Sequence, residues 1–143
     1  MEVGEIINQY LDEANIDTSL DRLDVSETQE QLVNNKHKWA ARLINHKIKF
    51  NKYKNDRSRL IAVNIEEYQQ QQPVMVNKAI AEKAVQRKEN IIDIDLKIKN
   101  EQLIIEFLDN IYKNITFATN DIKNLVELMK LETQWFILNI ILV

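Results

Sequence analysis

The sequence contains no cysteine and only one glycine and one proline in 143 residues. Without cysteine there is no disulfide framework and no thiolate zinc site. The single glycine, Gly4, excludes the glycine-rich loops that bring backbone amides close to nucleotide phosphates. Glycine and proline are also the residues that interrupt helices, so their scarcity predicts a mainly α fold with long helices in one domain.

Residues that carry chemistry are also scarce. No Ser/His/Asp arrangement or nucleotide-binding motif stands out, and the acidic start of the chain does not resemble a secretory signal. The two histidines, His37 and His46, are nine residues apart and fall on nearly opposite sides of a helix, so they cannot share a metal ion. We expect both at the surface. The sequence predicts a protein that is not an enzyme and holds no metal or cofactor.

Charge changes sign abruptly along the first half of the chain. Residues 1–30 hold nine acids and one base, a net charge of −8, whereas residues 31–60 hold nine bases and one acid, a net charge of +8. The formal charge of −3 for the whole chain conceals this division. A concentrated basic block attracts polyanions whatever the total charge, and the acidic block is a competitor within the same chain.

The spacing of apolar residues predicts the helices. A short amphipathic helix is expected over 5–13, then a turn over 14–25 and a capping box that pairs Ser26 with Gln29. A long helix should follow as far as Tyr68, because its apolar residues recur three, four and seven positions apart. Those apolar residues are Leu32, Trp39, Leu43, Phe50, Tyr53, Leu60 and Ile61.

The second half reads as helical after one clear break. Four glutamines and Pro73 predict a linker, since the residue before a proline resists helix. Residues 91–99 alternate like a strand but also fit a helical stripe, and we favour helix because no second strand is evident to pair with them. A weak break is expected over 116–120. The predicted regions are an acidic arm (1–25), a long basic helix (26–68), a linker (69–77) and a C-terminal oligomerisation region (78–143).

The chain ends in an almost wholly apolar run, WFILNIILV. This run is less than half the length that spans a bilayer, so we expect no membrane contact and a partner subunit instead. The predicted homo-oligomer interface consists of Ile122, Leu125, Met129, Trp135 and Leu138.

The basic block is the candidate binding surface. On a helical wheel Lys38, Arg42, Lys49, Lys52 and Arg59 cluster on one side, with Lys47 and Lys54 on the other flank of the apolar stripe. Bases interleaved with aromatic residues suit single-stranded nucleic acid, because cations meet phosphates and rings meet unpaired bases. The candidate contacts are Lys38, Arg42, Lys47, Lys49, Lys52, Lys54, Arg57 and Arg59. The alternative is a structural assembly protein whose charged faces only pair subunits, and an RNA-binding protein would show the same residues.

Several segments resemble the UvsY-like recombination mediators of T-even-type phages. IKNLVELMKLE (122–132) resembles the stretch that ends these proteins, and EFLDNIYKNI (106–115) resembles the helix before it. The Lys38–Trp39 pair and Tyr68 stand where the family has a Lys-Trp-like pair and the end of its basic helix. EIINQYLDEANID followed by LDRLDVSE resembles the acidic opening. The resemblance covers most of the chain in order and spacing, and 122–132 is its most specific part.

The resemblance implies an elongated helical protomer that assembles into a ring-like homo-oligomer through its C-terminal helices. Such proteins bind single-stranded DNA and help to load a RecA-like recombinase onto strands covered by a single-strand-binding protein, in the cytoplasm of the bacterial host. One departure matters, because Ala62 and Asn64 stand where the family commonly has a basic pair. The DNA-binding role would therefore shift to Arg57, Arg59 and the lysines before them.

Overall fold

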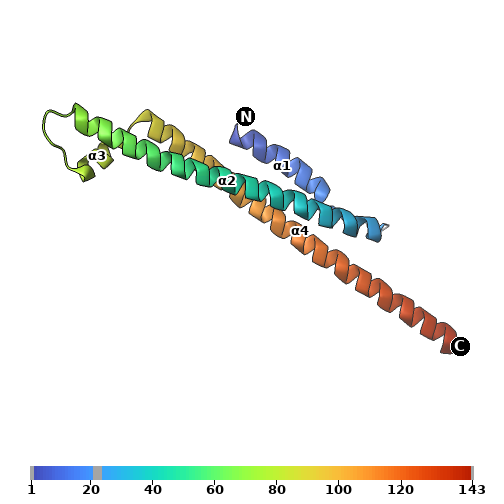
Figure 1. Cartoon of the computed structure of the whole chain (residues 1–143). Helices are drawn as coiled ribbons and strands as arrows, with labels where there is room; N and C mark the ends of the chain where they lie inside the picture. The colour runs from blue at the N-terminus through green and yellow to red at the C-terminus, as the bar shows by residue number, and fades with distance from the viewer. Residues whose placement is uncertain (1, 21–23, 143) are drawn as a thin grey trace. The chain divides into compact units, whose positions relative to one another are not determined.

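The computed structural model describes residues 2–20 and 24–142, which form four helices and no strand (Figure 1). The helices are α1 (Val3–Asp17), α2 (Val25–Gln71), α3 (Lys78–Val85) and α4 (Glu89–Leu142). The prediction of a mainly α protein with long helices is confirmed, and so is helix over 91–99. The ring-like assembly stays a prediction.

The chain divides into two compact units. One unit combines Met1–Arg42 with Phe107–Val143, and the other is Leu43–Glu106. Both long helices contribute to both units, and within each unit α2 and α4 run antiparallel. In the first unit Leu32 packs against Ala118 and Ile122. In the second unit, rising residue numbers on α2 meet falling numbers on α4, as His46 contacts Glu101 and Asn64 contacts Asn90.

The buried faces of α2 and α4 follow the spacing of paired helices. Buried apolar residues on α4 recur three and four positions apart at Ile104, Leu108, Ile111, Ile115, Ala118 and Ile122. On α2, Leu32, Trp39 and Leu43 follow the same pattern. This 3–4 spacing keeps a continuous apolar seam on one side of each helix, as in coiled coils. Three residues of the predicted stripe, Leu32, Trp39 and Leu43, therefore lie in the core, whereas Phe50, Tyr53, Leu60 and Ile61 are partly buried.

The end of α1 and the start of α2 differ from the expected positions. α1 continues to Asp17, so the first part of the predicted turn is helical; residues 21–23 of that turn lie outside the described residues. The cap at the start of α2 is Asp24 rather than Ser26, since the Glu27 backbone N–H donates to Asp24 Oδ1 at 3.1 Å. Aspartate caps helices as well as serine does, and Asp24, two residues before Ser26, is the cap here.

The helices are interrupted between Gln71 and Lys78, around Pro73, whereas residues 69–71 of the predicted linker belong to α2. α2 ends at Gln71, and α3 begins after Asn77, whose side chain accepts a hydrogen bond of 3.0 Å from the Ala79 N–H. Within the second unit, α3 covers the end of α2 by packing Ala81 and Val85 against Ile65 (Figure 1).

The predicted break over 116–120 is wrong, because α4 passes through this segment without interruption. The Thr116 and Thr119 hydroxyls donate to the backbone carbonyls of Tyr112 and Ile115, at 3.0 and 2.8 Å. Each hydroxyl thus finds a partner inside the helix. Ala118 between them is buried, so packing overrides the weak local helix propensity.

Candidate nucleic-acid interface

The candidate basic residues fall into both compact units and differ in what surrounds them. Lys38 and Arg42 belong to the first unit, which also contains α1. The other six, from Lys47 to Arg59, belong to the second unit. Each group has its own electrostatic environment.

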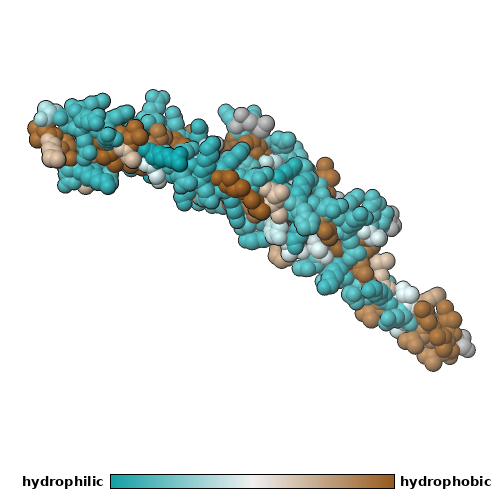
Figure 2. Space-filling model, viewed as in Figure 1, coloured by the Kyte–Doolittle hydropathy of each residue, from teal (hydrophilic) through white to brown (hydrophobic). Residues whose placement is uncertain are grey.

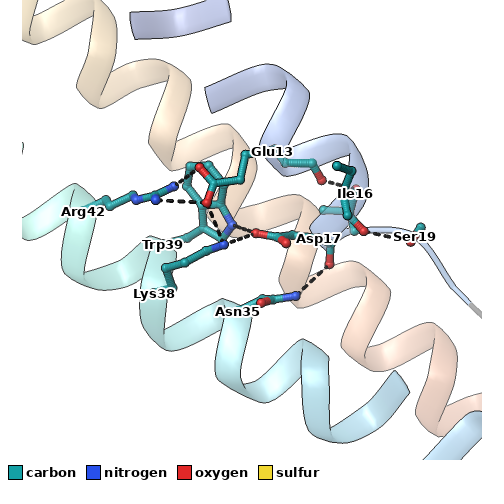
Figure 3. Close-up of polar contacts among 10 residues, drawn as sticks. Glu13, Ile16, Asp17, Ser19, Asn35, Lys38, Trp39 and Arg42 are labelled. Atoms are coloured by element: carbon teal, nitrogen blue, oxygen red, sulfur yellow. Dashed lines mark hydrogen bonds and ion pairs between the residues drawn. The ribbon is translucent and has the colours of Figure 1, made fainter. Parts of the chain in front are cut away.

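In the first unit, Glu13 of α1 joins both candidate cations (Figure 3). Arg42 donates two parallel hydrogen bonds to the Glu13 carboxylate, at 2.6 Å from Nη1 and 3.0 Å from Nη2. Lys38 Nζ donates to Glu13 Oε1 at 3.0 Å. A two-pronged arginine–carboxylate pair is among the stronger ionic contacts in proteins, so Glu13 holds the planar guanidinium in one orientation.

Asp17 completes the contact one turn further along α1. Its carboxylate lies 2.5 Å from Lys38 Nζ and accepts a hydrogen bond of 2.9 Å from Trp39 Nε1. The Asn35 side-chain amide donates to the Asp17 backbone carbonyl at 3.3 Å. These contacts explain why α1 continues to Asp17, because residues of α2 bind both the side chain and the backbone carbonyl of Asp17.

Aromatic rings lie within the same contact. Trp39 is fully buried, and its ring meets the Tyr10 ring edge-on at 5.7 Å between centroids. The Arg42 guanidinium carbon lies 4.6 Å from the centre of the Trp39 ring, within the range of a cation–π interaction. Lys38, Trp39 and Arg42 therefore form one basic and aromatic patch, which α1 covers.

The ion pairs shift the pKa values of the three charged groups that form them. Hydrogen bonding to Arg42, reinforced by Lys38, lowers the pKa of Glu13 from 4.5 to about 2 despite partial burial. The same contact with Glu13 raises the pKa of Arg42. Burial opposes the charge of Lys38, but hydrogen bonds to Asp17 and Glu13 outweigh it and raise the pKa of Lys38. All three groups are therefore charged near neutral pH.

In the second unit, four candidate cations are exposed and make neither an ion pair nor a cation–π contact with any residue that the structure describes; they are Lys47, Lys49, Lys52 and Arg59. Lys49, Lys52 and Arg59 fall within roughly a quarter of the helix circumference and span about 15 Å along α2. We call these three the open basic row. Asp56, the one acid of this block, lies among them on the same face.

The remaining two cations of the second unit have contacts within the chain. Lys54 Nζ lies 4.9 Å from the centre of the Phe50 ring. Arg57 is held more firmly, because its Nε donates to Asp95 Oδ1 at 2.5 Å and its Nη2 donates to Gln86 Oε1 at 2.8 Å. Arg57 is thus neutralised by α4, whereas Lys54 retains its charge on the flank of α2 away from the open basic row.

The positions that depart from the family resemblance carry no cation. Ala62 is exposed, whereas Asn64 is buried, with only 3% of its surface exposed. Asn64 and Asn90 exchange two side-chain hydrogen bonds, at 2.9 and 3.3 Å. Asn64 therefore belongs to the packing between α2 and α4 and leaves any binding role to the cations before it.

The expectation of two surface histidines is half wrong. His37 is exposed, but His46 is only 7% exposed, and its Nδ1 lies 2.6 Å from Glu101 Oε2. The sequence did contain a signal, because His46 lies seven residues after the buried Trp39 and so falls in the apolar seam. Among residues 2–20 and 24–142, no three His, Asp or Glu side chains form a group that could hold a metal ion.

The predicted interface residues divide into two groups. Ile122 is 1% exposed within its own unit, and Leu125 packs against the same cluster, so the chain itself covers both. Met129, Trp135 and Leu138 are exposed, with Trp135 at 69%. Figure 2 shows hydrophobic surface gathered at the C-terminal end of α4. Of the helices that the structure describes, none is long and apolar enough to cross a membrane.

Comparison with solved structures identifies the fold. The crystal structure of the bacteriophage T4 recombination mediator protein UvsY, in lattice type IV, matches with a TM-score of 0.73. The match covers 92% of this chain and 99% of the T4 protein, at 12% sequence identity. No family model matches the sequence, and no curated protein sequence matches it. The chain thus has the fold of the T4 mediator with a largely different sequence.

Proposed function

We propose that this protein is a recombination mediator that binds single-stranded DNA and helps to load a RecA-like recombinase onto strands covered by a single-strand-binding protein. The observation that carries the proposal is the open basic row of Lys49, Lys52 and Arg59, which faces solvent without an ion-pair partner among the described residues. The fold of the T4 recombination mediator supports it.

The arrangement suits binding that does not depend on sequence. Cations on one helix face neutralise phosphates, and each neutralised phosphate releases counterions from the strand. Contacts to phosphates carry no sequence information, so poly-dT and mixed sequences should bind alike. The three cations of the open basic row neutralise about three phosphates per subunit, which gives a slope of log K against log salt near −2.

The proposal includes a homo-oligomer held by the exposed apolar end of α4, where Met129, Trp135 and Leu138 would contact a second copy. Such a concentration of exposed apolar side chains on one helix end is unusual for a monomer. Oligomerisation would bring several open basic rows onto one strand and so raise the affinity through multiple contacts.

The test is a titration of labelled poly-dT, followed by fluorescence anisotropy at several salt concentrations. In the variant Lys49→Ala/Lys52→Ala/Arg59→Ala the slope should become shallower by about 2, since each lost contact removes about 0.7. Alanine preserves helix, so circular dichroism should be unchanged. A charge-matched control, Lys78→Ala/Lys83→Ala/Lys123→Ala, removes three exposed lysines elsewhere and should bind as the parent does.

The outcomes separate the two readings of the basic block. If the row variant binds poly-dT as tightly as the control, the row serves subunit pairing or solvation, and the structural-assembly alternative becomes the better one. Tighter binding of duplex or structured RNA than of poly-dT would move the proposal to a different nucleic acid. For loading, the parent should shorten the lag in DNA-dependent ATP hydrolysis by a RecA-like recombinase on covered strands, and the row variant should not.

A further inference from the structure

We propose that α1 is a displaceable cover over a second strand-binding site, formed by Lys38, Trp39 and Arg42, and that single-stranded nucleic acid competes with Glu13 and Asp17 for this site. The inference rests on the proposed function, because it takes a single strand as the ligand. It assigns a regulatory role to α1 and a ring-stacking role to Trp39.

The contacts of α1 use the chemistry of a bound strand. Carboxylate oxygens of Glu13 and Asp17 lie on Lys38 and Arg42, where phosphate oxygens would otherwise lie (Figure 3). The ring of Tyr10 contacts Trp39 at the place where an unpaired base would otherwise meet the indole. Cations beside an aromatic ring are the combination that single strands use, so the covered patch is suited to the same ligand as the open basic row.

The attachment of α1 combines ion pairs with a small apolar face. Ala14 is the one fully buried residue of α1, and Val3, Ile6, Ile7 and Tyr10 are partly buried. A short helix with a single fully buried residue opens at a lower cost in free energy than the paired helices α2 and α4, so a polyanion can replace the carboxylates while that pair stays folded. The short connection from Thr18 to Asp24 keeps α1 close to α2 and makes it an effective competitor even when it opens.

The cover should lower both the affinity and the salt dependence of strand binding. When a strand replaces Glu13 and Asp17, the freed carboxylates take up cations and cancel part of the counterion release from the phosphates. In the variant Glu13→Gln/Asp17→Asn, Lys38 and Arg42 are available without this exchange. The slope of log K against log salt should then become steeper by about 1.4, and affinity at low salt should rise roughly threefold or more.

The experiment compares this variant with a charge-matched control, Asp12→Asn/Glu30→Gln, which removes two exposed acids that make no ion pair with Lys38 or Arg42. Both are made in the full chain and titrated with poly-dT. Neutral side chains at 13 and 17 could loosen α1 altogether, and so a second measurement uses an intact α1. In the variant Trp135→Phe, Trp39 is the sole indole, and its buried emission should shift to the red or be quenched when poly-dT saturates the protein.

Each outcome decides one of the two proposals. A steeper slope than the control, together with a Trp39 signal on saturation, supports the cover. If the parent binds poly-dT through the open basic row but Trp39 emission stays constant and the variant matches the control, the cover is wrong and the proposed function stands. If neither the parent nor the variant binds poly-dT at low salt, both proposals fail.

Discussion

Acid should undock α1 through Glu13. Hydrogen bonding to Arg42 lowers the pKa of Glu13 from 4.5 to about 2 in the folded protein. A lowered folded-state pKa stabilises the docked form at pH values above 4.5, and this contribution is lost as the pH falls from 4.5 towards 2. A full shift would correspond to about 3 kcal/mol. Because 34% of the Glu13 side chain is exposed, solvent screening reduces the contribution to about 1–2 kcal/mol.

The perturbation that isolates this effect is Glu13→Gln, measured against the parent at a series of pH values. Both proteins carry Trp135→Phe, so Trp39 reports on α1 while circular dichroism reports on the long helices. In urea titrations at pH 7, Glu13→Gln should lower the free energy of α1 docking by about 1–2 kcal/mol. The difference in docking free energy between Glu13→Gln and the parent should fall by about half at pH 3 and disappear near pH 2.

Two results would contradict this reasoning. A difference that is the same at pH 7 and pH 3 would mean that glutamine disturbs packing and that the Glu13 charge is irrelevant. No difference at pH 7 would mean that the bidentate contact with Arg42 contributes nothing to docking. Asp12→Asn, at an exposed position of the same helix, is the control and should follow the parent at every pH.

Three further predictions concern the rest of the chain. His46→Leu and Glu101→Leu should each lower the free energy of unfolding by about 2–3 kcal/mol, because each leaves the other buried polar side chain without this hydrogen bond. The double variant should lie within about 1 kcal/mol of the parent in urea unfolding. Asp56→Asn should tighten binding of poly-dT by removing the one acid beside the open basic row, as measured by anisotropy. Deleting residues 133–143 should lower the mass of the oligomer measured by light scattering. An unchanged number of subunits would show that the tail is not part of the interface.

The seam between α2 and α4 could be predicted from the sequence because it depends on local spacing. Leu32, Trp39 and Leu43 are all buried, as the stripe indicated. The break at Pro73 was equally visible, since it depends on the geometry of one residue. The error over 116–120 has a physical cause: threonine and asparagine disfavour helix only when nothing else decides, and there Ala118 packs into the core.

The state of each cation could not be predicted, because it depends on residues distant in the sequence. Lys38 and Lys49 look alike in the basic block, yet Lys38 is paired with Glu13, 25 positions earlier, and Lys49 is exposed. The opposite charges of the two blocks did indicate that some pairing occurs. They could not indicate which bases are paired, because Arg42 is held by Glu13 of α1 and Arg57 by Asp95 of α4.

We infer that polar pairs in the second unit fix the register of α2 on α4 and thereby decide which cations stay free. Apolar residues three and four apart allow an antiparallel pair to slide by seven positions. The hydrogen bonds that the buried Asn64 exchanges with Asn90 oppose this sliding. A slip of seven would move Arg57 from Asp95 to Lys88 or Gln102, neither of which is acidic. Cysteines introduced at 57 and 95, in a chain that has none of its own, should be joined readily by a short thiol cross-linker. Adding Asn64→Leu/Asn90→Leu should lower the yield by allowing other registers, and an unchanged yield would show that apolar packing alone sets the register.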